Sequence, residues 1–286
     1  INGYQGRNLY VDFALAANYQ HVEVDNLIGV FAQNGTANFF FLEPAVRLRY
    51  EAETVYFNAN LWGAFNLADV AGTKTADLDN GQMGRSDVTA THTRVARWET
   101  ELSFFLEPIL DPEGYNDPAT PNTSTLAHEI FLRNWGQYSG QRLIPQHERI
   151  AGGLRTVRGY PQAFIAGDTV VISRGEYRLH IPRLFPINPD PIELPLIGKF
   201  RLVPQQVFGA PDWDLILRAF IDAAQVRQVD IQVGEENVEV IGLGLGLELQ
   251  VKSNFIARFD WGNARTATAD VAKGRNEFYF SVTLIF

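Results

Sequence analysis

The residues that could support catalysis are few and poorly spaced for it. The chain has five histidines: His21, His92, His128, His147 and His180. No two of them lie at a metal-ligand spacing such as H-x-x-x-H. Ser139 and His147 are close in the sequence, but glycine and proline lie between them and no oxyanion feature accompanies them. Cysteine is absent, which excludes a thiol nucleophile and thiolate metal sites. The sequence therefore predicts no enzyme, no catalytic residue, no metal site and no cofactor.

Composition narrows the class of protein further. The chain of 286 residues has 24 Lys plus Arg against 33 Asp plus Glu, a net charge of −9, so we expect no nucleic-acid partner. A hydrophobic content of 46% excludes a disordered chain. Phe occurs 20 times and Met once, a composition typical of β-structure. No apolar run is long enough for a transmembrane helix. The chain begins with Ile1 and shows no signal peptide, so we expect a mature or truncated form.

Strict alternation of apolar and polar residues predicts the elements. At the end of the chain, Phe278, Phe280 and Phe286 share one face with Val282 and Leu284, and polar residues occupy the other. About ten segments show this period, and many run 10 to 14 residues, whereas ordinary strands have roughly 5–6.

The polar face of two strands carries charge. In 213–222 the even positions include Asp214, Arg218 and Asp222, and in 169–181 they include Arg174, Glu176, Arg178 and His180. In 241–249 glycines occupy the corresponding positions, Gly242, Gly244 and Gly246. They do not match the phosphate-binding G-x-G-x-x-G. Glycine weakens a strand, so we expect another part of the chain to pack closely there.

Two architectures alternate in this way. A soluble β-sandwich or lipocalin-like barrel turns its polar face outward, whereas a transmembrane barrel turns its apolar face to lipid. Long strands, aromatic residues at strand ends and the terminal Phe286 favour the second. We therefore predict an all-β fold, a transmembrane antiparallel up-and-down outer-membrane β-barrel. Residues 71–93 and 111–125 are expected to be loops, and 182–211 a long connection with room for an extra strand.

One segment carries a specific resemblance. Residues 148–153 end in Gly-Gly and are followed by Val157, Arg158, Gly159 and Tyr160. Next come Gly167-Asp168 and a strand containing Glu176-Tyr177-Arg178, and then Phe220-Ile221-Asp222-Ala223. This ordered set resembles the outer-membrane superfamily of the BamA and TamA assembly factors and the TpsB two-partner-secretion transporters. It resembles the V-R-G-F/Y and F-x-D-x-G signatures, with Ala223 at the usual glycine. The match covers residues 137–286, and 137–153 is most similar to the TpsB branch.

The resemblance implies a long extracellular loop folded into the barrel lumen, with the V-R-G-Y tetrapeptide at its tip. It implies that Arg158 meets acidic residues on the inner wall. The alternation independently places Asp222 and Glu176 on the inner face, and Phe220 belongs to the same wall. A planar guanidinium suits paired carboxylates. We therefore expect Arg158 to bind Asp222, with Glu176 in reach. Such a latch either holds the loop in place or sets a conformation used in transport.

The resemblance implies three functions. The first is a polypeptide-translocating pore of the two-partner-secretion type, and the second a BamA- or TamA-like insertase. The third is a plugged barrel that anchors other envelope proteins. The partners are therefore a secreted or inserted polypeptide and the lipid bilayer, and the location is an outer membrane of Gram-negative type or of an organelle. Phe278, Phe280 and Phe286 are similar to a C-terminal β-signal.

Strand number is an expectation with two forms. No linker marks a second domain, so residues 1–286 are expected to form one barrel domain. Superfamily barrels have sixteen strands, more than this length supplies. Residues 24–31 could add one strand to the ten. We expect either missing N-terminal strands and POTRA domains or a closed barrel of twelve strands, because an open edge in lipid is costly.

Overall fold

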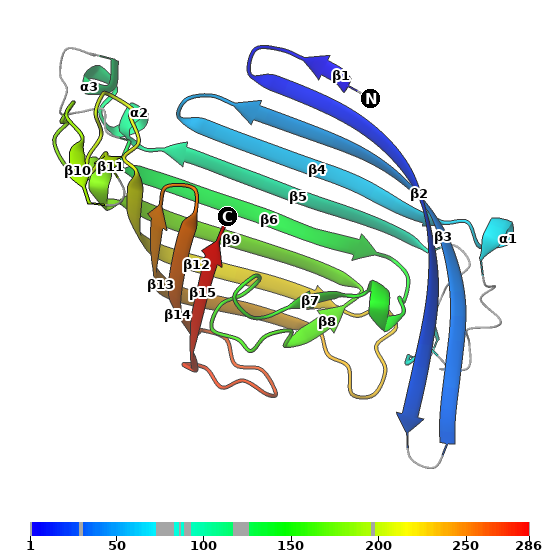
Figure 1. Ribbon diagram of the computed structural model, residues 1–286. Coiled ribbons are helices and arrows are strands. Elements are labelled where there is room, and N and C mark those ends of the chain that lie inside the picture. Colours follow the sequence, from blue (N-terminus) through cyan, green and yellow to red (C-terminus); the bar gives the residue numbers. More distant parts are fainter. Residues whose placement is uncertain are drawn as a thin grey trace.

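The protein is described here from a computed structural model. The structure describes residues 2–28, 31–72, 83–85, 87–88, 93–116, 126–195 and 198–285. Its main feature is one large sheet (Figure 1). The strands of this sheet, in spatial order, are β1 (Asn2–Gln5), β2 (Leu9–Ile28), β3 (Phe31–Glu51), β4 (Val55–Asn66), β5 (Arg94–Phe105), β6 (His128–Ser139), β9 (Thr169–His180), β12 (Trp213–Arg227), β13 (Val238–Val251), β14 (Phe255–Ala264) and β15 (Asn276–Leu284).

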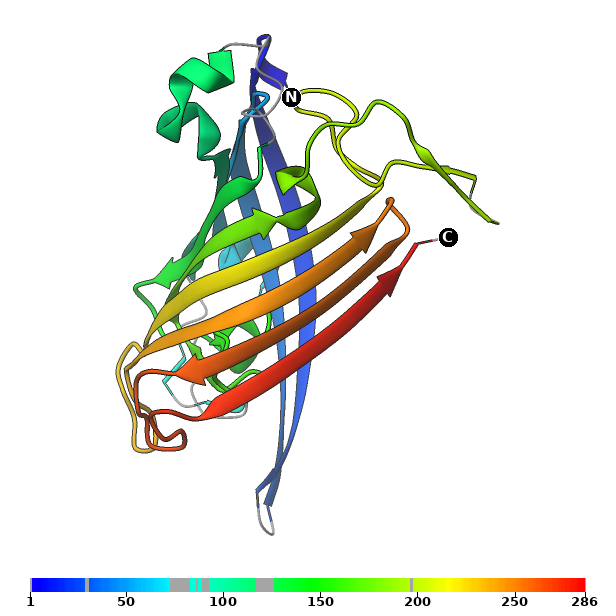
Figure 2. The ribbon, with the colours of Figure 1, turned by 90° about the vertical axis from the view of Figure 1, so that its left-hand side faces the viewer.

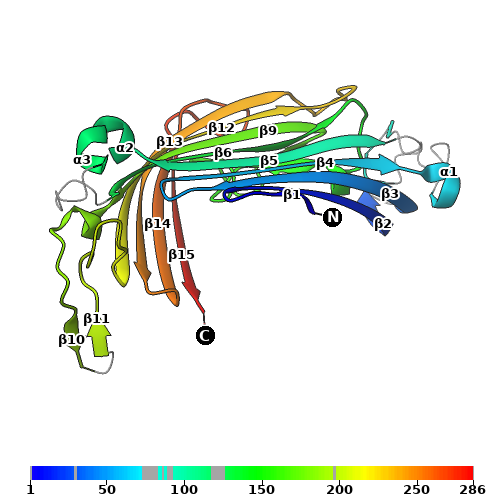
Figure 3. The same ribbon diagram turned by 90° about the horizontal axis from the view of Figure 1, so that it is seen from above.

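The sheet is antiparallel, and each of its strands pairs with the next one along the chain. The predicted all-β, up-and-down architecture is therefore confirmed. The sheet has eleven strands, with β1 and β15 at its edges. Seen from above, it bends into a trough, and β14 and β15 turn away from the plane of β4 to β9 (Figure 3). No pairing joins β1 to β15 within the described residues, so these strands do not form the closed ring of twelve.

The first hairpin differs from expectation. Within 24–31 the structure shows no added strand among the described residues, because 24–28 belong to β2 and Phe31 begins β3, and these two strands pair from Leu9↔Tyr50 to Ile28↔Phe31. The next strand, β4, pairs only with the part of β3 from Phe41 onward. The remainder of β2 and β3 therefore projects beyond the sheet as a two-stranded ribbon (Figures 1 and 2). Alternation predicted strands here but not how far they run.

The two faces of the sheet differ as the alternation predicted. On β12, Leu217 and Ile221 are 43% and 51% exposed, whereas Arg218 and Asp222 are 2% and 0% exposed. On β15, Phe278 and Phe280 project from the exposed face. The charged face is covered by the connection 140–168, so this face is the inner one. Its burial around Arg158 comes from this loop of the same chain.

The connections lie at two ends. At the end that we call the long-loop end are 140–168, 228–237 and 265–275. The connection 140–168 contains the small hairpin β7 (Arg149–Ala151) and β8 (Ile165–Gly167). Opposite is the C-terminal end, where β15 finishes. Of the predicted loop 111–125, residues Pro112–Asn116 form the helix α3 behind α2 (Glu107–Leu110), and 117–125 lie outside the described residues. In the predicted loop 71–93, Ala71 ends the helix α1 (Ala68–Ala71).

The long connection 182–211 contains its own two-stranded hairpin, β10 (Ile192–Leu194) with β11 (Gly198–Phe200). It adds no strand to the main sheet. Two 3-10 turns, Pro145–His147 and Ile181–Leu184, complete the elements. None of the helices in the described part of the chain has the length and apolar character needed to cross a membrane.

Candidate functional site

The tip of the connection 140–168 lies directly on the inner face of the sheet. A Cβ atom on Gly242 of β13 would overlap the carbonyl oxygen of Arg158. One on Gly262 of β14 would lie 2.6 Å from the backbone nitrogen of Gly159. Gly159 itself has φ +98°, a conformation that L side chains rarely adopt. The glycines of the sheet thus admit the loop backbone, and the close packing predicted from the strand glycines is found at Gly242.

Arg158 is fully buried and is surrounded by carboxylates. Its Nε and Nη2 donate to the two oxygens of Asp222 at 2.6 and 2.8 Å, and its backbone N–H donates to Asp222 Oδ2 at 3.0 Å. Its Nη2 also lies 2.8 Å from Glu176 Oε1. The guanidinium carbon lies 3.4 Å from the ring centroid of Phe220, a cation–π arrangement. The structure thus brings together Arg158, Asp222, Glu176 and Phe220.

A third carboxylate, which the sequence did not single out, completes this ring. Asp260 of β14 is buried, and its Oδ2 lies 3.4 Å from Arg158 Nη1. Asp260 also accepts hydrogen bonds from Arg218 at 2.6 Å and from Arg258 at 2.9 Å. It lies two residues beyond Arg258 on β14, on the same face of the strand. It was missed because the V-R-G-Y and F-x-D-x-G patterns do not include its strand.

More arginines line the wall around the carboxylates. Arg174 Nε lies 3.2 Å from Asp222 Oδ1, and Arg178 Nη2 lies 2.9 Å from Glu176 Oε2. The charges therefore alternate across β9, β12 and β14. Because each buried ion has partners of opposite sign, the cost of taking it out of water is offset locally. Removing one member would leave several others unmatched.

Tyr160 anchors the tip next to Arg158. Its hydroxyl lies at donor distance from two carbonyl oxygens, that of Thr266 at 2.8 Å and that of Ile241 at 3.1 Å. The same hydroxyl oxygen accepts a hydrogen bond from the Thr266 N–H at 3.2 Å. From β15, the Tyr279 hydroxyl donates to the Tyr160 carbonyl at 2.8 Å and accepts the Gly159 N–H at 3.0 Å. Val157 is fully buried in the same apolar cluster as Tyr160. The tetrapeptide thus contacts five strands, β9, β12, β13, β14 and β15, through its backbone and its side chains together.

The remaining predicted residues lie elsewhere. Phe278 and Phe280 project from the exposed face of β15, and Phe286 lies outside the described residues. Ser139 Oγ bonds the carbonyl of Gln141, whereas His147 bonds Gln20 and contacts two phenylalanine rings. The site is therefore an ionic lock between a loop and a wall, and its chemistry is that of charge pairing.

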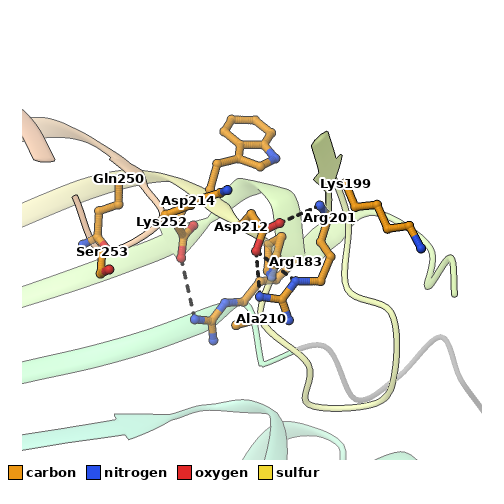
Figure 4. A pocket seen from close by; sticks show the side chains of 11 residues that line it. Arg183, Lys199, Arg201, Ala210, Asp212, Asp214, Gln250, Lys252 and Ser253 are labelled. Atoms are coloured by element: carbon orange, nitrogen blue, oxygen red, sulfur yellow. Dashed lines mark hydrogen bonds and ion pairs between the residues drawn. The ribbon is translucent and has the colours of Figure 1, made fainter. Parts of the chain in front are cut away.

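A second charged site lies at the C-terminal end (Figure 4). It is a hollow of about 670 Å³ between the 181–212 connection and the ends of β12 and β13. Its charged lining consists of Arg183, Lys199, Arg201, Lys252, Asp212 and Asp214. Arg201 bonds Asp212 at 2.6 Å, and Arg183 lies 3.6 Å from Asp214. Cations therefore outnumber carboxylates at this mouth of the trough.

Fold and lock together define an up-and-down antiparallel β-barrel wall with a loop held by charge against its inner face. The chain shares its fold with CdiB from Escherichia coli, at a TM-score of 0.66, 14% identity, and coverage of 99% of this chain and 43% of that one. It also matches CdiB from Acinetobacter baumannii, at a TM-score of 0.59 and 14% identity, with coverage of 99% of this chain and 40% of that one. A structure of BamA from Haemophilus ducreyi lacking POTRA domains 1–3 matches at a TM-score of 0.53 and 12% identity, with coverage of 98% of this chain and 52% of that one.

The chain spans less than half the length of either CdiB structure. No protein-family model matches the sequence, and the search of curated proteins gives no match. The resemblance drawn from the V-R-G-Y motif is thus confirmed at the level of the fold, in an outer-membrane β-barrel architecture shared with CdiB and BamA.

Proposed function

We propose that this chain is the membrane part of an outer-membrane pore that translocates a partner polypeptide, in the manner of two-partner secretion. The observation that carries the proposal is the fully buried Arg158, held by Asp222 and Glu176 on the inner wall. A loop latched by charge inside a barrel can be released without unfolding the wall. That property suits a pore that is closed at rest and opens for a passing chain.

The proposal assigns a direction to the two ends. The long-loop end faces the outside of the cell, and the C-terminal end faces the periplasm. A polypeptide would then enter past the cationic hollow near Lys199 and Lys252 and leave past the 140–168 connection. The exposed apolar band supports placement in a bilayer, because Leu217, Ile221 and Phe280 all project from the outer face. The proposal includes no catalytic step and no cofactor.

The test compares secreted and envelope proteins in cells that carry the intact wild-type protein, the Arg158→Ala variant, or neither. We expect one or very few polypeptides to disappear from the medium or cell surface and to accumulate in the periplasm when the protein is absent. The Arg158→Ala variant should reduce the export of the same polypeptides. Unchanged export in both strains would contradict the proposal.

An insertase of the BamA type is the second candidate, favoured by the sheet edges at β1 and β15, which pair with no further strand in the described part of the chain. An exposed strand edge can pair with an incoming strand. In that case the same comparison would show a loss of many outer-membrane barrels rather than of a few secreted proteins. Loss of neither class, with disruption of an envelope complex, would instead indicate a structural anchor.

A further inference from the structure

A further buried carboxylate, outside the ring around Arg158, lies at the long-loop end. Asp168 follows Gly167 at the start of β9 and is fully buried. Its two oxygens accept the backbone N–H groups of Leu143 at 2.7 Å and Val229 at 2.8 Å. These two residues belong to different connections, 140–168 and 228–237. Asp168 therefore joins two connections that lie far apart in the sequence.

Arginine from a third connection binds the same carboxylate. Arg85, from the β4–β5 connection, donates to Asp168 Oδ1 at 2.7 Å and Oδ2 at 3.1 Å. Its Nε donates to Glu235 at 2.9 Å, and its Nη1 lies 3.0 Å from Glu148. Arg142 binds both oxygens of Glu235, each at 2.7 Å. We call these residues the outer cluster: Arg85, Arg142, Glu148, Asp168 and Glu235.

The outer cluster lies between two separate apolar clusters, and we call the boundary between them the seam. Leu143 and Ile144, which follow Arg142, pack with Met83, which lies two residues before Arg85. Across the seam, Val226 and Val238 pack with the cluster that contains Val157 and Tyr160, on the side of Asp168 and Glu235. The two arginines thus stand on one side of the seam and their principal carboxylate partners on the other. Separation along this seam would break the ion pairs and leave each apolar cluster intact.

We infer that the outer cluster is a second latch, which holds the extracellular mouth closed by joining three connections and must open when a polypeptide leaves. This inference deepens the proposed function, on which it rests. Buried charge pairs suit such a seam because they are strong when dry and weaken once water enters between them. A seam of apolar contacts would lack this sensitivity to wetting.

The test is ion conductance of the purified intact protein in planar lipid bilayers at physiological ionic strength. The variants Arg142→Gln and Glu235→Gln each remove one charge from the seam. We expect each to raise the frequency of open events by about tenfold or more, because charge-assisted bonds are the strong ones in such networks. The matched controls are Arg227→Gln and Glu239→Gln. These two residues form a pair at 3.1 Å near the same mouth, with side chains 51% and 68% exposed, and should leave conductance unchanged.

A cross-link provides the opposite test. The chain has no cysteine, so the double variant Arg142→Cys/Glu235→Cys carries the only thiols. We expect raised currents before treatment with a short bis-maleimide and background currents after it. Unchanged currents in both charge variants, while unheated gels show folded barrels, would overturn the second latch. So would equal currents before and after complete cross-linking.

These measurements separate the latch from the proposed function. Conductance needs no partner polypeptide, whereas the export comparison does. Raised currents in the Gln variants together with unchanged export would support the latch and contradict the secretion role. Normal currents in the Gln variants together with lost export in cells without the protein would contradict the latch and support the secretion role.

Discussion

Arg158 is buried where water does not reach it, so the carboxylates around it depend on its guanidinium to balance their charge. Asp222 and Asp260 are equally buried, and both lie on strands that face the trough. An isolated buried carboxylate is costly, and breaking one buried pair typically destabilises by about 3–5 kcal/mol. The cost of removing Arg158 therefore comes more from the wall charges that are left unmatched than from the loss of the arginine itself.

The first prediction is that Arg158→Ala releases the loop while the wall stays inserted. We expect protease cleavage within 140–168 to rise by tenfold or more, as about 3 kcal/mol of lost pairing implies. The control is Arg155→Ala, since Arg155 is exposed on the same loop and makes no ion pair among the described residues. Equal protection of the loop in both variants would contradict the latch.

The second prediction concerns the loop backbone. Gly242→Ala should displace the tip, because the new methyl group would overlap the carbonyl oxygen of Arg158. We expect a loss of about 1–3 kcal/mol in stability against urea, the usual cost of overpacking. Gly175→Ala is the control, because the added Cβ at that strand glycine lies 3.4 Å from Ile221, an ordinary contact. A similar loss in both variants would show that the effect belongs to strand glycines in general.

At the scale of elements, the connection 140–168 is held at two places. Arg158 fixes its tip, and Asp168 fixes its base beside β9. The outer cluster has two arginines and three carboxylates, so one negative charge is in excess when all are ionised. Burial raises the pKa of Glu148 to about 7, and repulsion by Asp168 and Glu235 adds to this against the attraction of Arg85. Burial and, to a lesser extent, the positive charge of Arg97 lower the pKa of the adjacent His147 to about 4. The His147 ring is therefore neutral at physiological pH.

This gives a third prediction. The pKa of Glu148 is higher in the folded state than its ordinary 4.5. The stabilisation from its protonated form is therefore fully present below about 4.5 and lost as pH rises through about 7. We expect the outer mouth to open more often at pH 8 than at about pH 5 in planar bilayers. Glu148→Gln, which keeps the neutral shape, should flatten this dependence, and a slope that persists in Glu148→Gln would assign the titration to another group.

At the scale of the molecule, the proposed placement in a bilayer requires the exposed face to meet lipid along whole strands. The fourth prediction is that Leu245→Arg or Phe259→Arg blocks assembly, because an arginine near the bilayer midplane costs roughly +2–4 kcal/mol. Gln250→Arg on the inner side of the same β13 strand is the control and should assemble normally. Heat-modifiable migration on gels reports insertion, and efficient folding of the two outward variants would show that the faces are reversed.

Sequence alone predicted those features that repeat or follow a motif. The alternation in 213–222 gave the inner face of β12, and the V-R-G-Y tetrapeptide pointed to Asp222 and Glu176. Period two does not determine where a strand ends, so the full reach of β2 and β3 was missed. The outer cluster was missed for a different reason. Arg85 and Asp168 are 83 residues apart, and no local pattern indicates that two connections meet.

Fixing one loop at both its tip and its base has a kinetic consequence. While Asp168 holds the base, a tip that detaches from Asp222 stays close to its site, at an effective concentration that favours rapid rebinding. The two attachments then act like a bivalent ligand, whose combined residence time exceeds that of either attachment alone. Losing the base would shorten the lifetime of the bound tip although no contact of Arg158 had changed.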